Sequence, residues 1–372
     1  MFVTIIPYKM VFGGKVLAKI DNKTVFVEGS LPNETIEIEI TKDKKDYSEA
    51  VATKILNSSE HRVEPFCNNY EQCGGCNLQI ADYDYQLQLK REILQDLFTR
   101  NKVTLPEITV VSDNSVEYRS RFQFSRGGLK SKNSNAIVPL TDCPCAVPEM
   151  RSVLQNSSKL LKAHDRLHVF AHKNVCNPEK FVFGLDDGNS ELSLKLLDKI
   201  ITFDARGFFQ SNIAMLEKTI PLIVDGLQGK HLLDMYSGVG TLSVFAAHKF
   251  EHVTLVEHNK KALQFANINF STAGFTNFST FPMSGELWAK KAKKHTYDTL
   301  IIDPPRSGIE KPLLQWLCTE KIPTVRYLSC DPATLARDTK LLLEAGYSIE
   351  EFYLLDYYPH THHMECLVWF TC

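Results

Sequence analysis

The sequence predicts a mixed α/β protein whose C-terminal half forms a doubly wound parallel sheet. Between residues 206 and 372, apolar runs of strand length alternate with helical stretches, which is typical of a parallel sheet with helices on both faces. Residues 1–56 instead contain short β-rich runs separated by turn residues, which predicts a small β-barrel. The chain of 372 residues is long enough for several cores, and we expect three domains. Their expected bounds are 1–56, 57–205 and 206–372.

The predicted barrel takes its strands from VLAKI, KTVFVEG, ETIEIEIT and SEAVATKIL. Turns are expected at Gly13-Gly14, Asp21-Asn22 and Pro32-Asn33. Barrels of this type commonly bind nucleic acid, and a purely structural barrel is an equally good interpretation of this segment alone.

The composition is that of a globular protein, with 44% hydrophobic and 23% charged residues. No apolar run approaches the roughly 18 residues that span a bilayer, so no membrane partner is expected. The first residues lack the pattern of a signal peptide, which favours the cytoplasm. Disulfides are rare in that reducing compartment, so clustered cysteines among the ten present indicate metal binding or catalysis.

The central segment contains one clear predicted helix, about residues 83–100. It also contains a basic stripe at residues 118–132, with five basic side chains, no acid and three interleaved aromatic residues. The stripe predicts a strand pair around Gly127-Gly128 and contact with RNA phosphates, although the net charge of −2 excludes a uniformly basic protein. A solvated surface is the alternative interpretation.

Three motifs predict a ligand pocket at the carboxyl edge of the C-terminal sheet. A strand ending at Asp234 runs into the turn Tyr236-Ser237-Gly238-Val239-Gly240 and a helix, and the next strand ends at Glu257. Glycines in such a turn allow the backbone to approach a ligand, and the acid can accept hydrogen bonds from ribose hydroxyls. This pair also fits a NAD-binding domain, although the full GxGxxG pattern is absent. Asp303, followed by two prolines, ends a third strand at the same edge.

The candidate nucleophile is Cys330, in a turn between a fourth strand and a helix that begins near Ala333. The positive end of that helix is expected to stabilise a thiolate. Glu365 follows a histidine-rich loop and is the general-base candidate. The loop lacks the histidine spacing of a helical metal site, so metal is not expected there. A cysteine, a base and a hydrogen-bonding carboxylate are the groups needed to methylate carbon 5 of a pyrimidine through thiolate addition at carbon 6.

Taken together and in order, DMYSGVGTL, DPPRSG, YLSCDPATLARD and YPHTHHMEC resemble the RNA uracil-5-methyltransferase family over nearly the whole chain. The resemblance implies S-adenosylmethionine as methyl donor, an RNA uridine as substrate and a covalent cysteine adduct. It implies Cys330 as nucleophile, Glu365 as proton acceptor, and four residues that contact the cofactor, which are Gln210, Tyr236, Glu257 and Asp303. Ser284 departs from the family, whose members often carry Asn or an acid near the adenine.

The N-terminal half is similar to the ribosomal RNA members of that family. Residues 1–55 resemble the TRAM domain, an RNA-binding barrel, with Pro32-Asn33-Glu34 where Pro-Gly-Glu is usual. Cys67, Cys73, Cys76 and Cys143 resemble an iron–sulfur site, and the resemblance implies a 4Fe–4S cluster. From spacing alone zinc is as good a prediction, and Cys145 is an alternative fourth ligand.

The expected function is therefore methylation of carbon 5 of a uridine in 23S ribosomal RNA. The alternatives are a transfer RNA uridine methyltransferase, which the C-terminal motifs fit equally well, and a non-catalytic RNA-binding protein, which the intact Cys330, Glu365 and Asp303 disfavour. The target base must leave its stack to reach the thiol, and Phe208 or Phe209 is the candidate stacking partner.

Overall fold

The computed structural model describes residues 3–132, 134–176, 180–185, 187–292 and 297–372. The chain forms two compact units. The first comprises Met1–Asp96, Leu129–Pro139 and Tyr358–His363, and the second comprises Leu97–Gly128, Leu140–Tyr357 and Met364–Cys372. The domain boundaries expected near residues 56 and 205 stay predictions.

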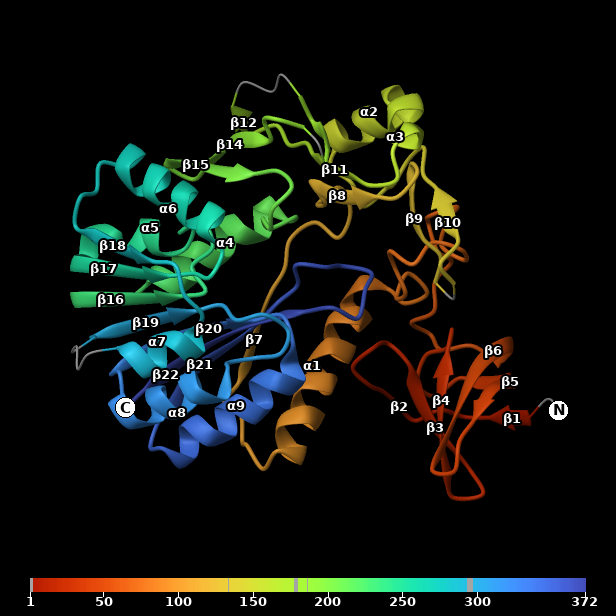
Figure 1. Cartoon of the computed structure of the whole chain (residues 1–372). Coiled ribbons are helices and arrows are strands. Elements are labelled where there is room, and N and C mark those ends of the chain that lie inside the picture. The colour runs from red at the N-terminus through yellow and green to blue at the C-terminus, as the bar shows by residue number, and fades with distance from the viewer. Residues whose placement is uncertain (1–2, 133, 177–179, 186, 293–296) are drawn as a thin grey trace. The chain divides into compact units, whose positions relative to one another are not determined.

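The first unit contains a six-stranded sheet in the order β1-β5-β6-β4-β3-β2, drawn in red to orange in Figure 1. Its strands are β1 (Val3–Ile5), β2 (Lys9–Met10), β3 (Val16–Ile20), β4 (Lys23–Glu28), β5 (Thr35–Asp43) and β6 (Tyr47–Asn57). Only β4 and β6 pair in parallel; the other pairs are antiparallel. The four runs predicted as strands are β3 to β6, so the N-terminal β-fold is confirmed.

Alternation along the strands builds the core of this sheet. Val25 and Val27 on β4 and Ile36 and Ile38 on β5 are buried, while their neighbours are partly exposed, as expected when every second side chain faces one side. Asn33 has a φ of +66°, in the left-handed region that glycine favours. Asparagine tolerates this conformation better than most residues, which explains how Asn33 occupies the usual glycine position of the turn.

Helix α1 (Tyr83–Arg100) has the bounds that were predicted. The basic stripe, in contrast, does not form one strand pair. It contains β8 (Arg121–Phe124) and β9 (Gly128–Lys130), which are joined only by a bridge between Ser125 and Gly128. β9 pairs with β10 (Ile137–Pro139), and β8 pairs with β11 (Leu167–Phe170) from later in the chain.

The second unit is built on an eight-stranded sheet in the order β18-β17-β16-β19-β20-β22-β21-β7. Five neighbouring strands of this sheet pair in parallel: β16 (Gly229–Met235), β17 (Phe250–Val256), β18 (Phe278–Phe281), β19 (Thr299–Ile302) and β20 (Thr324–Ser329). The apolar runs of all but the edge strand β18 are almost fully buried, as in a sheet covered on both faces. The doubly wound C-terminal sheet predicted from the sequence is confirmed.

The far half of this sheet departs from the all-parallel expectation. β22 (Glu365–Thr371) lies between β20 and β21 (Ser348–Leu355) and is antiparallel to both. β7 (Ile108–Val111), far away in sequence, pairs in parallel with β21 at the edge. β22 enters from a loop rather than a crossover helix, so nothing forces it to run parallel to its neighbours.

Two groups of helices flank the sheet (Figure 1). One group is α4 (Ile213–Val224), α5 (Ser243–Ala246), which continues into a 3-10 turn (Ala247–Lys249), and α6 (Lys260–Thr272). The other is α7 (Gly285–Lys291), α8 (Lys311–Glu320) and α9 (Pro332–Glu344). Side chains of Asn212, Asn259 and Asp331 cap α4, α6 and α9 by accepting hydrogen bonds from backbone N–H groups of the first turn.

Two three-stranded sheets complete the second unit. In the first, β11 pairs with β8 on one side and with β13 (Val182–Gly184) on the other. In the second, β14 (Glu191–Leu196) pairs with β12 (Val175–Cys176) and with β15 (Lys199–Asp204). Helices α2 (Pro148–Asn156) and α3 (Ser158–Ala163) precede β11. Among the described residues, no helix is both long enough and apolar enough to cross a bilayer.

Candidate active site

The candidate site lies where the strand order of the large sheet reverses. After β16 the chain goes to β17 and β18 on one side, and it then crosses over to β19 on the other. Met235 and Ile302 pair at the carboxyl ends of β16 and β19, and the Asp303 N–H donates to the Met235 carbonyl at 3.4 Å. Ligands of open α/β sheets bind in the crevice at such a switch point. The glycine-containing turn and Asp303 therefore meet at one edge, as the motifs predict.

The turn after β16 requires its glycines for two reasons. Gly238 and Gly240 have φ values of +56° and +75°, in the region that side chains disfavour. A Cβ atom at Gly240 would also lie 3.0 Å from the Phe270 ring and 3.1 Å from Leu255. Tyr236 adopts a positive φ of +59° without being glycine, a strained conformation of the kind that collects at functional sites.

Glu257 follows β17 directly and faces this turn. Its carboxylate accepts hydrogen bonds from the Gly238 N–H at 3.2 Å and the Asn259 N–H at 2.7 Å. Two backbone donors fix the orientation of the carboxylate and leave it acceptor positions for ligand hydroxyls.

The Tyr236 hydroxyl and Ser284 both lie at the start of helix α7. The Tyr236 hydroxyl accepts a hydrogen bond from the Glu310 N–H at 3.5 Å, and a Cβ on Gly285 would come within 2.9 Å of that hydroxyl. Ser284 caps α7: its Oγ accepts a hydrogen bond from the Leu287 N–H at 3.2 Å. Ser284, at the position where members of the resembled family often carry Asn or an acid, therefore acts as the N-cap of α7.

The sheet register places Cys330 beside Glu365. Ser329, the last residue of β20, pairs with Cys366 on β22. Because the two strands are antiparallel, Cys330, which follows Ser329, lies alongside Glu365, which precedes Cys366. Asp331 caps α9 immediately after the thiol. Cys330 is partly exposed, whereas Glu365 is only 3% exposed.

The surroundings of Cys330 disfavour the thiolate. Burial, followed by the carboxylates of Glu365 and Asp303, raises the pKa of Cys330 to about 12, and only Arg306 acts in the opposite direction. The N-terminus of α9 is expected to stabilise the thiolate, whereas burial and the two nearby acids act against it. The stabilisation by the helix stays a prediction.

The carboxyl groups of Glu365 and Asp303 also have raised pKa values. Burial and the charge of Asp303 raise the pKa of Glu365 well above its usual range, and Arg306 partly offsets this. Burial raises the pKa of Asp303 to about 7. A carboxylate with a raised pKa is a stronger base, and such shifts are typical of catalytic groups.

Gln210 lies close to the start of α4 and carries an unsatisfied group. It is 9% exposed, and none of the residues that the structure describes forms a hydrogen bond with its Oε1. A buried amide oxygen without a partner is costly unless a ligand supplies one. Its two neighbours differ sharply: Phe209 stacks on Phe203 at 3.9 Å in the core, whereas Phe208 is 72% exposed. Only Phe208 is therefore accessible to a base.

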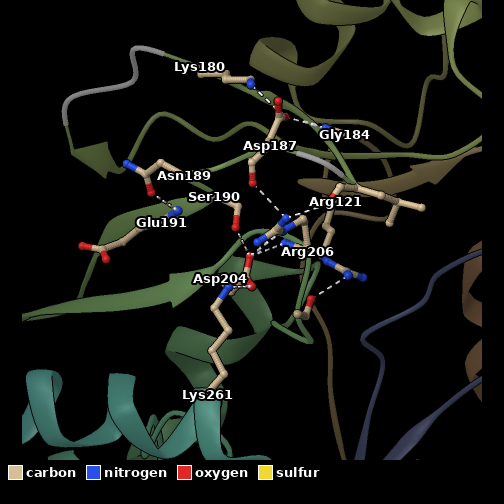
Figure 2. A network of polar contacts seen from close by, with 12 residues as sticks. Arg121, Lys180, Gly184, Asp187, Asn189, Ser190, Glu191, Asp204, Arg206 and Lys261 are labelled. Carbon is tan, nitrogen blue, oxygen red and sulfur yellow. Dashed lines mark hydrogen bonds and ion pairs between the residues drawn. The ribbon is translucent and has the colours of Figure 1, made fainter.

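A polar network holds the loop that carries Phe208 and Gln210 (Figure 2). Asp204 at the end of β15 accepts hydrogen bonds from Ser190 Oγ at 2.5 Å and the Arg206 N–H at 2.9 Å, and it forms an ion pair with Lys261 of α6. The Arg206 guanidinium donates to the carbonyls of Leu185 and Asp187 at 2.9 and 3.0 Å. Although Asp204 is partly buried, its hydrogen bonds with Lys261 and Ser190 hold its pKa at about 2.

Arg121 of the basic stripe belongs to the same region, since its guanidinium donates to the Gly207 carbonyl at 2.7 Å. The aromatic residues of the stripe, Tyr118, Phe122 and Phe124, are buried and cannot stack on RNA. Arg126 is well exposed and forms an ion pair with Asp165 at 2.8 Å.

Two models of known families match this chain. The model described as tRNA (uracil-5-)-methyltransferase matches residues 151–372, and the TRAM domain model matches residues 5–53. An uncharacterized RNA methyltransferase of Treponema denticola is 40% identical, with 96% of each chain covered. The chain belongs to the RNA (uracil-5-)-methyltransferase family.

A second relative and a solved structure are also similar to this chain. The 23S rRNA (uracil(1939)-C(5))-methyltransferase of Vibrio campbellii is 28% identical, with 96% of this chain and 93% of that protein covered. The crystal structure of the tRNA (uracil-54, C5)-methyltransferase of Pyrococcus abyssi, in complex with S-adenosyl-L-homocysteine, has the same fold. Its TM-score is 0.77, at 23% identity and with 99% and 100% of the two chains covered.

The cysteines of the N-terminal half of this methyltransferase are divided between the units. Cys67, Cys73 and Cys76 belong to the first, where Cys73 is buried and its Sγ accepts a hydrogen bond from the Gly75 N–H at 3.4 Å. Cys143 belongs to the second, where a hydrogen bond with Cys145 lowers its pKa to about 7. Within the part of the chain that the structure describes, no three His, Cys, Asp or Glu side chains are gathered as a metal site. The cluster therefore stays a prediction.

Three residues that shape the methyltransferase site were not singled out from the sequence. Asn269 of α6 is buried; it donates to the carbonyls of Thr202 and Val239 and accepts from the Thr202 N–H. Arg306 acts on Cys330 and Glu365, and Asp338 binds the loop that carries Arg306. The position of Arg306 in DPPRSG was a usable signal. Asn269 and Asp338 offered none, because a polar residue on a helix is expected to be exposed until its packing is known.

Proposed function

We propose that this chain methylates carbon 5 of a uridine in 23S ribosomal RNA, with S-adenosylmethionine as methyl donor and Cys330 as covalent nucleophile. The observation that supports it best is the register of β20 and β22, which brings Cys330 next to Glu365 one strand away from the switch point. Family membership makes this chemistry the natural interpretation of the pair.

The residues at the switch point fit the methyl donor. The glycine turn leaves room for close backbone approach, Glu257 offers an oriented carboxylate for ribose hydroxyls, and Gln210 has an unpaired Oε1. Tyr236 and Asp303 flank the same crevice and complete the proposed contacts. When bound, the donor supplies an electrophilic methyl group.

In the proposed reaction, the Cys330 thiol loses its proton to water and its Sγ bonds to carbon 6 of the uracil, which moves the electron pair of the 5,6 double bond toward carbon 5. Carbon 5 then bonds to the methyl group, and the electron pair of the broken methyl–sulfur bond stays on the donor sulfur. Glu365 removes the remaining carbon 5 proton, the electron pair re-forms the 5,6 double bond, and the thiolate leaves. The raised pKa makes Glu365 a stronger base once its carboxyl group is ionised. Because its pKa is raised, the Cys330 thiol is mainly protonated at neutral pH. Nearby positive charge favours the thiolate, and Arg306 supplies part of that charge.

A gel assay with 5-fluorouridine RNA tests the two roles separately. Fluorine cannot leave as a cation, so wild-type protein should form a denaturation-resistant complex, and Cys330→Ala should form none. Glu365→Gln should permit addition and methyl transfer on ordinary RNA, and then accumulate methylated RNA bound to the protein. An adduct that survives in Cys330→Ala would move the nucleophile elsewhere, with Cys366 the first candidate. Normal turnover by Glu365→Gln would move the base, with His362 and His363 next.

The ribosomal substrate is proposed from the relatives that span the whole chain. The Vibrio campbellii protein is named for 23S rRNA, and it aligns with 96% of this chain. Transfer RNA is the alternative, because the matching family model carries that name. Mapping 5-methyluridine in total RNA from a deletion strain decides between them. Loss from 23S rRNA alone supports the proposal, and loss from transfer RNA alone refutes it.

Phe208 is the proposed stacking partner of an extruded base or of its neighbour. It is 72% exposed, and it lies two residues from Gln210 on a loop held by Asp204 and Arg206. Base–aromatic stacking contributes about 1–3 kcal/mol per base. Phe208→Ala should therefore weaken RNA binding by about 5- to 150-fold, whereas Phe209→Leu should act only through stability.

An iron–sulfur cluster on Cys67, Cys73, Cys76 and Cys143 remains a proposal that rests on cysteine spacing and on the resemblance to the ribosomal RNA members. No step of the reaction depends on it. Anaerobically purified protein should be brown and contain iron and acid-labile sulfide. Stoichiometric zinc without iron would exclude the cluster.

A further inference from the structure

The turn that carries Cys330 is fixed to the start of helix α9. Asp331 accepts hydrogen bonds from the Ala333 N–H at 3.0 Å and the Thr334 N–H at 2.9 Å. Ser329 Oγ donates to the Asp331 carbonyl at 3.1 Å and accepts from its N–H at 3.3 Å. These contacts leave the turn little freedom, so the position of the thiol follows the position of α9.

One face of the same helix holds the loop after β19, residues 303–309. Thr334 Oγ1 donates to the Arg306 carbonyl at 3.2 Å, and the Arg337 guanidinium donates to the Ser307 carbonyl at 3.1 Å. Asp338 accepts a hydrogen bond from the Ile309 N–H at 2.9 Å. Residues three and four apart lie on one face of a helix, so these three side chains form a continuous support for the loop.

Asp338 is the centre of this support. It is fully buried, and the carboxylate oxygen that binds Ile309 also accepts from the Tyr327 hydroxyl of β20 at 2.8 Å. Its other oxygen accepts from Arg337 Nε at 2.8 Å. A buried carboxylate is costly, and it is tolerated here because each oxygen is hydrogen-bonded.

Gly308 leaves the space that this arrangement needs. A Cβ at that residue would lie 2.5 Å from the Arg337 guanidinium and 2.7 Å from the Asp338 carboxylate. Its φ of +76° is also in the region that glycine favours. The loop and the helix are therefore shaped to contact each other at this point.

We propose that Asp338 is a positioning residue for the methyltransferase reaction. It holds the segment from Asp303 to Arg306 in a fixed arrangement with Cys330, because α9 carries both the loop support and the turn of the thiol. Asp338 itself is buried and touches neither proposed substrate. The inference rests on the proposed function for the roles of Cys330 and Asp303. It implies that loss of Asp338 slows the reaction much more than it weakens binding of the methyl donor.

Single-turnover methylation at saturating RNA and S-adenosylmethionine tests this. Asp338→Ala should slow methyl transfer and 5-fluorouridine adduct formation by about 100-fold, the effect expected of a misplacement of roughly 1 Å. The dissociation constant of S-adenosylmethionine should change far less. Asp338→Asn keeps an oxygen for Tyr327 and Ile309 and should restore most of the rate. Equal rates for Asp338→Ala and wild type would overturn the proposal.

Leu342→Ala is the matched control, because Leu342 is also fully buried on α9 and its side chain is not part of the loop support. If Leu342→Ala and Asp338→Ala lose the same activity below both unfolding transitions, the role of Asp338 is only structural and the proposal fails. If Asp338→Ala does not fold, Arg337→Ala replaces it. The Arg337 side chain is 48% exposed, and its loss removes the Ser307 contact. Arg337→Ala should then show a smaller rate loss with unchanged donor affinity, and a wild-type rate would overturn the proposal.

The same experiment separates this inference from the proposed function. A wild-type protein that neither methylates uridine RNA nor forms the 5-fluorouridine adduct refutes the proposed function. A wild-type protein that does both, alongside an equally fast Asp338→Ala protein, refutes only the role of Asp338.

Discussion

At the scale of single residues, burial raises the pKa of each reactive group of this site. Burial, then Glu365 and Asp303, raise the pKa of Cys330 to about 12, and burial raises that of Asp303 to about 7. Neighbouring carboxyl groups in a desolvated crevice resist ionisation together, since each added negative charge repels the others. Positive charge near these groups favours their ionisation, and Arg306 supplies it for Cys330 and Glu365.

The reactivity of Cys330 toward iodoacetamide should follow from this. A thiol with a pKa of about 12 has roughly a thousandfold less thiolate at pH 8 than one at 9.0, so Cys330 should be alkylated far more slowly than the exposed Cys372. Its rate should keep rising with pH beyond 9. Asp303→Asn removes a negative charge and should speed the reaction, whereas Arg306→Gln should slow it further. Peptide-resolved mass spectrometry measures each site, and labelling of Cys330 as fast as that of Cys372 at pH 8 would contradict the assigned pKa.

At the scale of elements, helix α6 connects the glycine-containing turn after β16 to β15, the strand that precedes Phe208. Asn269 donates to the Val239 carbonyl of the turn at 2.9 Å, and it forms hydrogen bonds with both the N–H and the carbonyl of Thr202 on β15. Two turns earlier on α6, Lys261 pairs with Asp204 at the end of the same strand. The helix thus anchors the last part of β15 through Thr202 and Asp204. Figure 2 shows the second of these contacts, from Lys261 to Asp204.

Removal of the Asn269 amide should be costly. Asn269→Ala leaves three buried backbone groups without partners, and we expect a loss of about 3 kcal/mol in the free energy of unfolding. Binding of S-adenosylmethionine should also weaken, because the Val239 contact supports the glycine turn. Urea unfolding and titration calorimetry measure the two effects. Asn267→Ala on the exposed side of α6 is the control, and an equal loss there would show that the Asn269 contacts have no special weight.

At the scale of the whole molecule, the charges are balanced overall and uneven locally. The net charge is −2, while the stripe at residues 118–132 contains five basic residues and no acid. Arg126 of the stripe forms a highly exposed ion pair with Asp165. Exposed ion pairs contribute little to the free energy of folding. This leaves Arg126 available to interact with phosphate, with Asp165 opposing that attraction.

Substitution of Arg126 and substitution of Asp165 should therefore change RNA binding in opposite directions. Arg126→Ala should weaken binding and reduce the slope of log affinity against log salt by about 1, as expected when one phosphate contact is lost. Asp165→Asn should strengthen binding, because it removes a like charge from the RNA path. Fluorescence anisotropy across salt concentrations measures both. Lys340→Ala, which breaks an exposed ion pair with Glu344 on α9, is the control. If Arg126→Ala behaves like Lys340→Ala, the stripe is only a solvated surface.

Local patterns were sufficient for much of this protein. Strand runs, the helix at 83–100, and the strand-end positions of Glu257, Asp303 and Cys330 follow from periodicity and turn chemistry, which act over a few residues. Because carboxyl ends of parallel strands share one edge, the strand order of the chain is enough to assign those residues to one site. The ordered motifs were enough to predict the family.

Only the tertiary structure decided how the distant parts meet. The antiparallel insertion of β22 sets Glu365 beside Cys330, and the addition of β7 and the pairing of β8 with β11 join segments far apart in sequence. Burial decided that Phe208 rather than Phe209 is accessible, and that Cys330 has a raised pKa. The support of the catalytic loop by Asp338 was likewise invisible in the sequence. Each of these depends on desolvation and contacts across the fold, which no local pattern encodes, whereas the sequence by itself determined the elements, the family and the chemical groups of the site.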